Sequence, residues 1–380
     1  MSKPKHNLFI LFLTLLCGWH CKQVYQPPAT LNNPFILVVD GIVLSGNDST
    51  VITLSRTRSL TSDTPSVKET GATVSVVGVT GVEYPLTEEG NGVYSINQLL
   101  LDTSQQYQLK VITSDRNEFR SDLTKVRTSP PIDSLYWGQD SSYNVHVYLN
   151  THDPTNNTRY YRWNFVETWE YRSAYNSFLQ LVNDSPVFRP LDQQIYRCYQ
   201  TQNSSSILVD NTSRLSSDVV NKYEITNIPN GSEKITHLYS NLVKQYAITL
   251  DAFNFWQNLK RNTEQLGTLF DLQPFTELGN IHCLSNPSVK CIGYISFSTV
   301  QEQRIFISIN QVYPWNYSPY YEECGLDTIK PSDLTLYFPV GGPYFYSLVG
   351  TDNGAIIFST NLCVDCTYHG GTTVKPPFWP

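Results

Sequence analysis

Charged side chains are scarce in this sequence, and basic ones are scarcer than acidic ones. Of the 380 residues, 16% are charged, with 26 Lys and Arg against 33 Asp and Glu, which gives a net charge of −7. A broad nucleic-acid-binding surface needs an excess of basic residues, so we do not expect a nucleic-acid partner. Aromatic residues reach 13% of the chain. A disordered chain has the opposite composition, with few aromatic residues and many charges.

Long apolar runs are also missing after the N-terminus. No later stretch reaches the roughly 18 apolar residues of a membrane-spanning helix. The most apolar run covers residues 8–16 (LFILFLTLL) and follows Lys3 and Lys5. It is too short to cross about 30 Å of hydrocarbon as a helix, and it has the pattern of a secretory signal peptide. We therefore expect an exported chain without a membrane-spanning segment.

Motifs of common enzyme classes are absent as well. The sequence contains no GxSxG nucleophile elbow, no HExxH zinc motif, no phosphate-binding P-loop and no EF-hand loop. The histidines outside the signal region are spread along the chain, so we interpret them as structural residues. We expect no catalytic residues, no cofactor and no bound metal, and therefore a protein that is not an enzyme.

Two cysteines follow the apolar run, and one of them is a candidate for lipidation. Cys21 lies after the small Gly18 and before a polar, proline-containing stretch, whereas Cys17 would leave a short apolar region. We predict lipidation of Cys21, with Cys17 as the alternative, so that residues 1–20 form the signal peptide and residues 21–33 a tether. Buried acyl chains stabilise membrane binding by about 0.8 kcal/mol per CH₂. The alternative is an ordinary signal peptide with incidental cysteines.

Six further cysteines make disulfide bonds the default expectation for an exported protein. Cys283 and Cys291 flank a turn-rich segment and could form a local disulfide. Cys363 and Cys366 have the spacing of zinc ligands, with His369 nearby, but no second pair completes a set of four ligands. Disulfide bonds are therefore preferred to a zinc site, and several pairings remain open. The candidates are Cys198, Cys283, Cys291, Cys324, Cys363 and Cys366.

The N-terminal part, residues 34–128, predicts a β-sandwich of the immunoglobulin-like or transthyretin-like kind. Short segments with strand patterns recur between turn signals, which is typical of sandwiches. Tyr107 is placed where many sandwiches have a tyrosine whose hydroxyl bonds back to the chain. The predicted strands cover residues 36–43, 51–55, 73–79, 92–96, 107–113 and 118–121.

Pro130 and Pro131 mark the predicted boundary with a larger domain, residues 132–380. This second domain is also β-rich and contains one amphipathic helix at about residues 251–266. Apolar residues recur on one face of that helix, so we expect it to pack on a sheet. The predicted strands cover residues 144–151, 160–170, 222–226, 235–249, 291–297, 304–309 and 355–360.

Residues 173–220 and 311–347 are less regular and predict long loops. The second stretch contains aromatic residues that could stack on a ligand or contact a partner. Covering the ends of a β-sheet is the alternative role for these rings. The candidate contact residues are Tyr313, Trp315, Tyr317, Tyr320 and Tyr321.

Several motifs resemble those of one protein family. The most specific motifs lie after residue 220, and they are joined by segments at residues 35–41, 130–137 and 159–163. Through these motifs the chain resembles the Bacteroidota outer-membrane lipoproteins grouped as domain of unknown function 4249. The resemblance implies a setting near TonB-dependent transporters and supplies no active site. The specific motifs are Phe255-Trp256, the stretch 262–267, Gly279-Asn280-Ile281-His282, Ser285-Asn286-Pro287, Gly293-Tyr294, the stretch 363–366 and the stretch 370–373.

Within that resemblance, Cys283 and Cys291 look like additions to the family pattern, which fits a local disulfide between them. Together, these interpretations predict a non-enzymatic, lipid-anchored protein of the outer membrane, exposed on the cell surface. We expect an accessory or ligand-contacting component of a TonB-dependent transporter. The first alternative is an independent surface lipoprotein that binds a glycan or a peptide. A hydrolase without a recognisable motif is a second, less favoured alternative.

Overall fold

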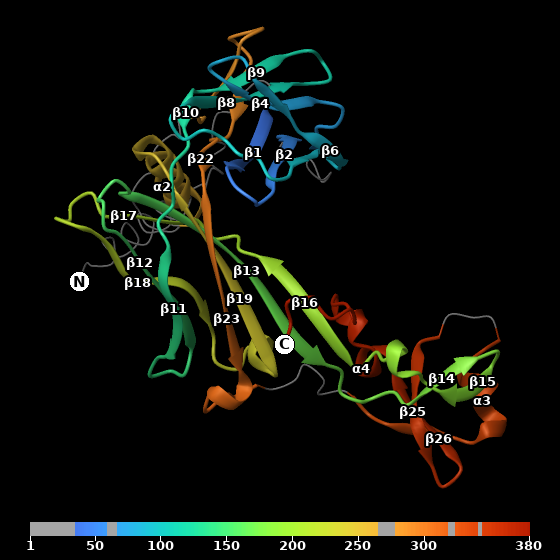
Figure 1. The fold of residues 1–380 in the computed structure, drawn as a ribbon. Coiled ribbons are helices and arrows are strands. Elements are labelled where there is room, and N and C mark those ends of the chain that lie inside the picture. Colours follow the sequence, from blue (N-terminus) through green and yellow to red (C-terminus); the bar gives the residue numbers. More distant parts are fainter. Residues whose placement is uncertain (1–34, 59–66, 265–277, 318–323, 341–343) are drawn as a thin grey trace, which may run out of the picture.

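The protein is mainly β, as the sequence predicts (Figure 1). Figure 1 shows three regions: a sandwich at the top, a central region of long strands, and a small distal module at the lower right. The predicted signal peptide, the tether and the lipidation candidates Cys17 and Cys21 lie outside the described residues. No helix in the described chain is long and apolar enough to cross a membrane. The computed structural model describes residues 35–58, 67–264, 278–317, 324–340 and 344–380.

Two sheets form the sandwich that the sequence predicts for the N-terminal part. One sheet has the strand order β21-β1-β2-β7-β6, with β3 beside β2 and β22 beside β1, and the other has the order β20-β9-β8-β4-β5, with β10 beside β8. Alternate side chains such as Ile52, Leu109 and Phe119 are buried between the two sheets. The N-terminal strands are β1 (Leu37–Leu44), β2 (Thr50–Arg56), β3 (Val67–Lys68), β4 (Thr73–Gly78), β5 (Glu83–Pro85), β6 (Thr87–Gly90), β7 (Val93–Ile96), β8 (Gln106–Ile112), β9 (Glu118–Ser121) and β10 (Thr124–Lys125).

Strands from the C-terminal half complete both sheets of this sandwich. β20 (Ile281–Cys283) pairs with β9, whereas β21 (Cys291–Ile292) and β22 (Phe297–Ser298) run parallel to β1 in the opposite sheet. Phe297 is buried in the sandwich core. The segment 281–298, which we assigned to the second domain, therefore belongs structurally to the sandwich.

Tyr107 fixes a loop of the sandwich, as the sequence predicts. Its ring is buried, and its hydroxyl accepts a hydrogen bond from the backbone N–H of Asp102 at 2.9 Å. The ring also stacks with that of Phe297, with ring centroids 6.3 Å apart. This side chain therefore connects the N-terminal strands with the segment that completes them.

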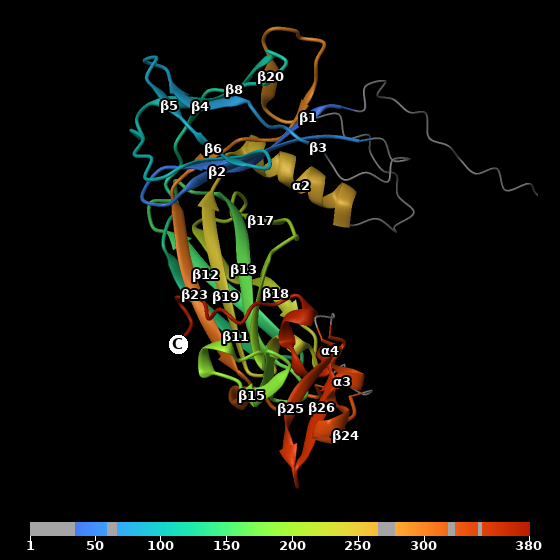
Figure 2. The same cartoon turned by 90° about the vertical axis from the view of Figure 1, so that its right-hand side faces the viewer.

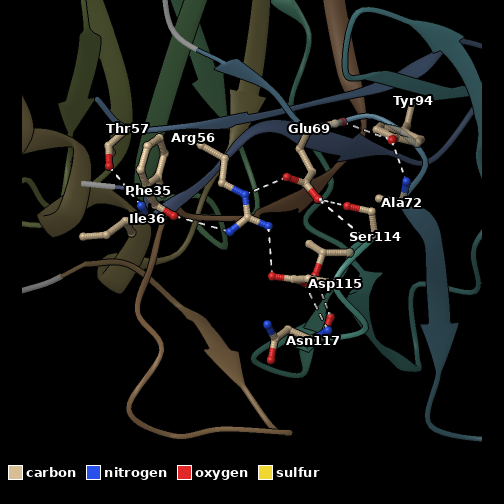
Figure 3. Close-up of polar contacts among 11 residues, drawn as sticks. Phe35, Ile36, Arg56, Thr57, Glu69, Ala72, Tyr94, Ser114, Asp115 and Asn117 are labelled. Carbon is tan, nitrogen blue, oxygen red and sulfur yellow. Dashed lines mark hydrogen bonds and ion pairs between the residues drawn. The ribbon is translucent and has the colours of Figure 1, made fainter. Parts of the chain in front are cut away.

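Polar contacts around Arg56 hold the first described residues against the sandwich (Figure 3). Arg56 Nε donates to Glu69 Oε2 at 2.6 Å, and Arg56 Nη1 donates to the carbonyl of Phe35 at 3.3 Å. Asp115 Oδ2 lies 3.5 Å from the same guanidinium. The hydrogen bond to Glu69 raises the pKa of Arg56, which keeps it charged. Since Phe35 follows the predicted tether, this cluster holds the chain where the tether would join the fold.

Two further sheets form the central region and share one core. One has the order β11-β12-β18, and the other has the order β16-β13-β19-β23, with β17 beside β13. Large rings, including Trp163 and Tyr239, are fully buried in this core. The strands are β11 (Ile132–Gln139), β12 (Val145–Asp153), β13 (Tyr160–Arg172), β16 (Arg197–Asn203), β17 (Leu208–Asn211), β18 (Asp218–Ile228), β19 (Leu238–Ala247) and β23 (Val300–Ser308).

The predicted amphipathic helix is α2 (Leu250–Glu264). Its apolar face packs against the central region, where Ala252 and Trp256 are buried. Thr249 supports the start of the helix, because its Oγ1 accepts a hydrogen bond from the N–H of Ala252 at 3.2 Å. Figure 2 shows α2 lying beneath the sandwich and beside β17. The predicted end of the helix beyond Glu264 lies outside the described residues.

The distal module combines parts of the two stretches that we expected to be loops with residues 348–366, which include the predicted strand at 355–360. Its buried centre includes Leu179, Leu334 and Phe358. The loop prediction is therefore wrong for these segments, and also for β16 and β17, which pair with β13. The strands in these segments are short, so the alternation of polar and apolar residues is too brief to identify them. The elements are β14 (Leu179–Val182), β15 (Ser185–Phe188), β24 (Asp327–Ile329), α3 (Leu334–Tyr337), β25 (Tyr346–Asp352), β26 (Ala355–Thr360) and α4 (Asn361–Val364).

Two disulfide bonds stabilise this module, and both use predicted cysteines. Cys324 bonds with Cys363 inside the module, while Cys198 on β16 bonds with Cys366 and ties the module to the central sheet.

The expected local disulfide between Cys283 and Cys291 is not formed. Both residues are buried free thiols, on strands that belong to opposite sheets of the sandwich. The turn-rich segment between them therefore connects two sheets instead of closing a local loop. Burial raises the pKa of the Cys291 thiol to about 12, which keeps it protonated and unreactive.

Candidate functional site

The aromatic residues predicted to contact a ligand do not gather into one stacking surface among the described residues. Tyr313 is 88% exposed, whereas Trp315 packs against the central core and its Nε1 donates to the carbonyl of Ser232 at 3.1 Å. Burial raises the pKa of Tyr317. Tyr320 and Tyr321 lie outside the described residues. For Trp315, the alternative role of covering a sheet end describes its position better.

A cavity of about 790 Å³ lies between helix α2 and the segment that completes the sandwich. This volume falls within the range of about 300 to 1,000 Å³ that is typical of ligand sites. Residues 251–261 of α2 form one wall, and residues 278–294 form the other. Many of the lining side chains are exposed, so the cavity is an open cleft. We call it the α2 cleft.

The helix contributes its polar face to the α2 cleft. Asp251, Asn254, Asn258 and Arg261 line the cavity, and their spacing places them on one side of the helix. Asp251 lies in the first turn and Arg261 in the last turn, so the acidic and basic ends of this wall are about 15 Å apart. Of the buried apolar residues of α2, Ala252 and Trp256 pack in the core beneath the helix, whereas Phe255 also lines the cleft. The same amphipathic pattern that packs the helix therefore also supplies the polar wall.

The opposite wall is fixed by close backbone packing. Gly279 has φ +123°, and a Cβ at this position would lie 1.7 Å from the carbonyl oxygen of Gly293, so no larger residue fits there. Asn280 is buried; its Nδ2 donates to the carbonyl of Ile295 at 3.0 Å, and its Oδ1 accepts from the N–H of Ile295 at 2.8 Å. These contacts hold His282 at the cleft surface.

Titratable groups gather around Tyr294 at one end of the cleft. The ring of Tyr294 contacts that of Phe255, with centroids 5.4 Å apart. Burial raises the pKa of Tyr294, and the negative charges of Asp251 and Asp122 act in the same direction. His282 Nε2 lies 3.1 Å from Asp122 Oδ1. This end of the cleft is therefore acidic.

The cleft presents polar and charged side chains that a ligand could contact. His282 contacts Asp122, and no hydroxyl or thiol nucleophile among the described residues hydrogen-bonds to it. The described part of the chain also contains no group of three His, Cys, Asp or Glu that could hold a metal ion. What the cleft offers a ligand is amide, carboxylate and cationic side chains over a partly buried aromatic floor.

Comparison with known proteins places the chain in a family. Residues 23–304 match the family described as Domain of unknown function (DUF4249), and the chain belongs to this family, as the motifs indicate. The match ends within β23, so the predicted motifs at 363–366 and 370–373 lie beyond it. No curated protein matches the chain.

Likenesses to solved structures are weak. A cytokine receptor complex is 9% identical, with 55% of this chain and 90% of that chain covered and a TM-score of 0.18. A two-domain fibronectin type-III segment of chicken tenascin is 10% identical, with 55% of this chain and 88% of that chain covered and a TM-score of 0.15. Trypsin-activated alpha-2-macroglobulin from Escherichia coli is 9% identical, with 57% and 15% covered and a TM-score of 0.19. We draw no functional argument from these values.

Four of the motifs that carry the family resemblance contribute residues to the α2 cleft. Phe255, the stretch Gly279–His282, Pro287 and Tyr294 all line it, although they are separate in the sequence. Sequence reasoning identified these motifs without recognising that they meet. The available signal was their concentration between residues 255 and 294, in the short region that leaves the central sheet and returns to it.

A second candidate surface lies on the distal module, which exposes many large apolar side chains. Large apolar side chains exposed on a folded module are candidates for contact with a partner. We call these residues the distal surface. They are Phe178 (57% exposed), Phe188 (84%), Leu191 (92%), Leu336 (78%), Val340 (69%) and Phe345 (76%).

Proposed function

We propose that this protein is a non-enzymatic lipoprotein, anchored in the outer membrane and exposed on the cell surface, that serves as an accessory, ligand-contacting component of a TonB-dependent transporter. The observation that carries the proposal is the set of exposed apolar side chains on the distal module. The module lies at the far end of the molecule from the sandwich (Figures 1 and 2). A predicted lipid tether leads into the sandwich, so the apolar contact surface would be held away from the anchor. This arrangement suits a protein that reaches a neighbour in the same membrane.

The disulfide bonds support the same proposal. The bond between Cys324 and Cys363 closes the distal module, and the bond between Cys198 and Cys366 fixes the module to the central sheet. A contact surface on a rigid support loses less conformational entropy on binding than a mobile one. We propose that the distal surface docks on a transporter and that the α2 cleft contacts the ligand.

Affinity purification from detergent-solubilised outer membranes tests the docking role. The wild-type protein should co-purify with a TonB-dependent β-barrel identified by mass spectrometry. Changing Leu191→Glu together with Leu336→Glu should reduce that recovery at least tenfold, because two charges would have to be buried at the interface. Leu100→Glu is a matched control, since Leu100 is 74% exposed but lies in the sandwich region.

Three results would count against the proposal. They are recovery without any β-barrel partner, equal recovery with the double variant, and a mature protein without fatty acid. The thermal unfolding temperature of the double variant, compared with that of the wild type, separates lost docking from lost folding.

The second candidate function is an independent surface lipoprotein that binds a glycan or a peptide. The α2 cleft is the observation that favours it, because a ligand site needs no transporter to act. A protein that binds ligand through the cleft but never co-purifies with a β-barrel would support this second function over the first.

A further inference from the structure

We propose that the α2 cleft binds an extended peptide segment that carries opposite charges at its two ends, and that the segment adds as a strand to the free edge of β20. This inference rests on the proposed ligand-contacting role and names the class of ligand. It depends on three observations: the edge of β20, the charge pattern of the cleft walls, and the length of the cleft.

The backbone of β20 has an edge turned away from its partner strand. β20 pairs with β9. On its other side the preceding Gly279 forms a parallel bridge with Gly293, and none of the described strands pairs with Ile281 or Cys283 on that side. Across that ladder, Asn280 accepts from the N–H of Asp122 at 2.9 Å and Leu284 donates to Glu118 at 2.8 Å. Antiparallel pairing alternates these bonds along the strand, so the N–H and C=O groups of Ile281 and Cys283 point away from β9.

Ile281 and Cys283 also line the α2 cleft. Their outward backbone groups therefore meet the cleft and not another strand of the described chain. An extended peptide can satisfy such groups by strand addition, a common mode of peptide recognition. A glycan has no regular backbone of alternating donors and acceptors to match them.

The charges of the cleft favour a dipolar ligand. Asp122, paired with His282, and Asp251 lie at the end near Tyr294, while Arg261 lies about 15 Å further along α2. Lys290 adds a second cation to the lining. A neutral ligand would desolvate Asp251 and Arg261 without giving them partners, which costs free energy. A ligand with a cation at one end and an anion at the other would pair with both.

The distance between the charged ends sets the length of the ligand. An extended chain rises about 3.3 Å per residue, so about 15 Å corresponds to four or five residues. The amide side chains of Asn254 and Asn258 lie between the charged ends of the helix wall. They can accept and donate hydrogen bonds to the polar side chains of such a segment.

Fluorescence anisotropy with synthetic labelled pentapeptides tests the proposal on the full-length protein in detergent. Three probes share a Thr-Val-Thr centre: one has Lys first and Glu last, one has Glu first and Lys last, and one has Thr at both ends. One of the two charged peptides should bind at least tenfold more tightly than the neutral peptide. A copy of the preferred peptide with an N-methyl group on the central valine should bind at least tenfold more weakly, because strand addition needs the backbone N–H.

Variants of neighbouring cations on α2 locate the site. Arg261→Gln should lower the ratio of affinities for the charged and neutral peptides about tenfold. Lys260→Gln is the matched control and should leave this ratio unchanged, because Lys260 does not line the cleft. Equal affinity for charged and neutral peptides, or no binding by any peptide, would overturn the proposal. So would glycan-array binding that is lost in the Arg261→Gln variant.

The two proposals fail separately. Co-purification with a β-barrel depends on the distal surface and should be unchanged in the Arg261→Gln variant. If the peptides fail to bind while that recovery persists, only the ligand assignment falls. If the peptides bind as expected and no barrel is ever recovered, the docking proposal falls instead.

Discussion

The turn after β12 depends on one carboxylate, that of Asp153. It accepts hydrogen bonds from the backbone N–H groups of Thr155 at 2.9 Å, Asn157 at 3.0 Å and Thr158 at 2.8 Å. Burial alone would raise the pKa of Asp153, but the hydrogen bonds from Thr155 and Thr158 outweigh burial and lower the pKa to about 2. The charged form therefore stabilises the folded protein.

This pKa predicts how the free energy of unfolding changes with pH. The unfolded value is about 3.9, so the stabilisation is complete above about pH 4 and is lost as the pH falls towards 2. Asp153→Asn should lower the free energy of unfolding by about 1 to 2 kcal/mol at pH 6. The gap between variant and wild type should narrow by pH 3, as measured by urea unfolding.

The exposed Asp192 provides the control for this prediction. Asp192→Asn should leave the free energy of unfolding close to that of the wild type at both pH values, because the carboxylate of Asp192 lies on the surface. A gap for Asp153→Asn that stayed constant from pH 6 to pH 3 would contradict the role of its charge.

Individual residues were predictable where a local rule applies to them. Tyr107 follows a sandwich pattern, and its hydroxyl bonds back to Asp102 as expected. Cys198, Cys324, Cys363 and Cys366 were expected in disulfides, but their pairing was not. Pairing depends on which segments meet in space, and local sequence patterns do not contain that information.

Among the elements, helix α2 and the regular strands followed from their hydrophobic periods. Alternation of buried and exposed positions is clear in β8 and β12, and both were predicted. β11 and the strands β14 to β17 were missed. These strands pair only at one side or lie in polar stretches, so their patterns are weak.

The element that most needed the structure is the segment 281–298. Its strand character was partly predicted, at residues 291–297, but not its place in the sandwich. The family motifs in this segment were recognised, while the α2 cleft was not, because the cleft forms only when α2 and the sandwich edge are brought together. Long-range contact is the missing information in both cases.

A core substitution tests the contribution of this segment. Phe297 is 1% exposed and belongs to the sandwich core. Phe297→Ala should lower the free energy of unfolding by about 3 to 5 kcal/mol, as cavities of this size do. Hydrogen exchange followed by mass spectrometry should show the faster exchange in β1 and β8, far away in sequence.

Phe345→Ala is the matched control for that substitution. This ring is 76% exposed on the distal module, so its removal should change stability little. If Phe297→Ala accelerated exchange only in the central sheets, the assignment of this segment to the sandwich would be wrong.

For the whole molecule, the sequence predicted a β-rich chain with a sandwich followed by a larger β region. It did not predict a third, distal module, because that module is assembled from residues between the central strands β13 and β16 and from residues after β23. The bond between Cys198 and Cys366, 168 residues apart, joins it to the central sheet. Segments that are distant in the sequence thus form one module in space, so the order of the chain does not reveal the modules.

Removing this bond tests how the module is held. In a variant with Cys198→Ser and Cys366→Ser, we expect a loss of about 2 to 5 kcal/mol in the free energy of unfolding, as for other long-loop disulfides. Hydrogen exchange should rise in β16 and in residues 366–372, while β1 and β8 keep their protection.

Removal of the other disulfide makes the comparison specific. Cys324→Ser with Cys363→Ser should instead raise exchange in β24 and α4, inside the distal module. Faster exchange in the sandwich of either variant would show that the regions are not stabilised separately.

The return of the chain into its first region affects its folding. Two sheet edges of the sandwich stay uncovered until residues 281–298 have packed against them. A chain that has folded only its N-terminal strands therefore exposes open sheet edges to neighbouring chains. Folding of this protein should depend on a holding chaperone more than folding of a sandwich made from one continuous stretch.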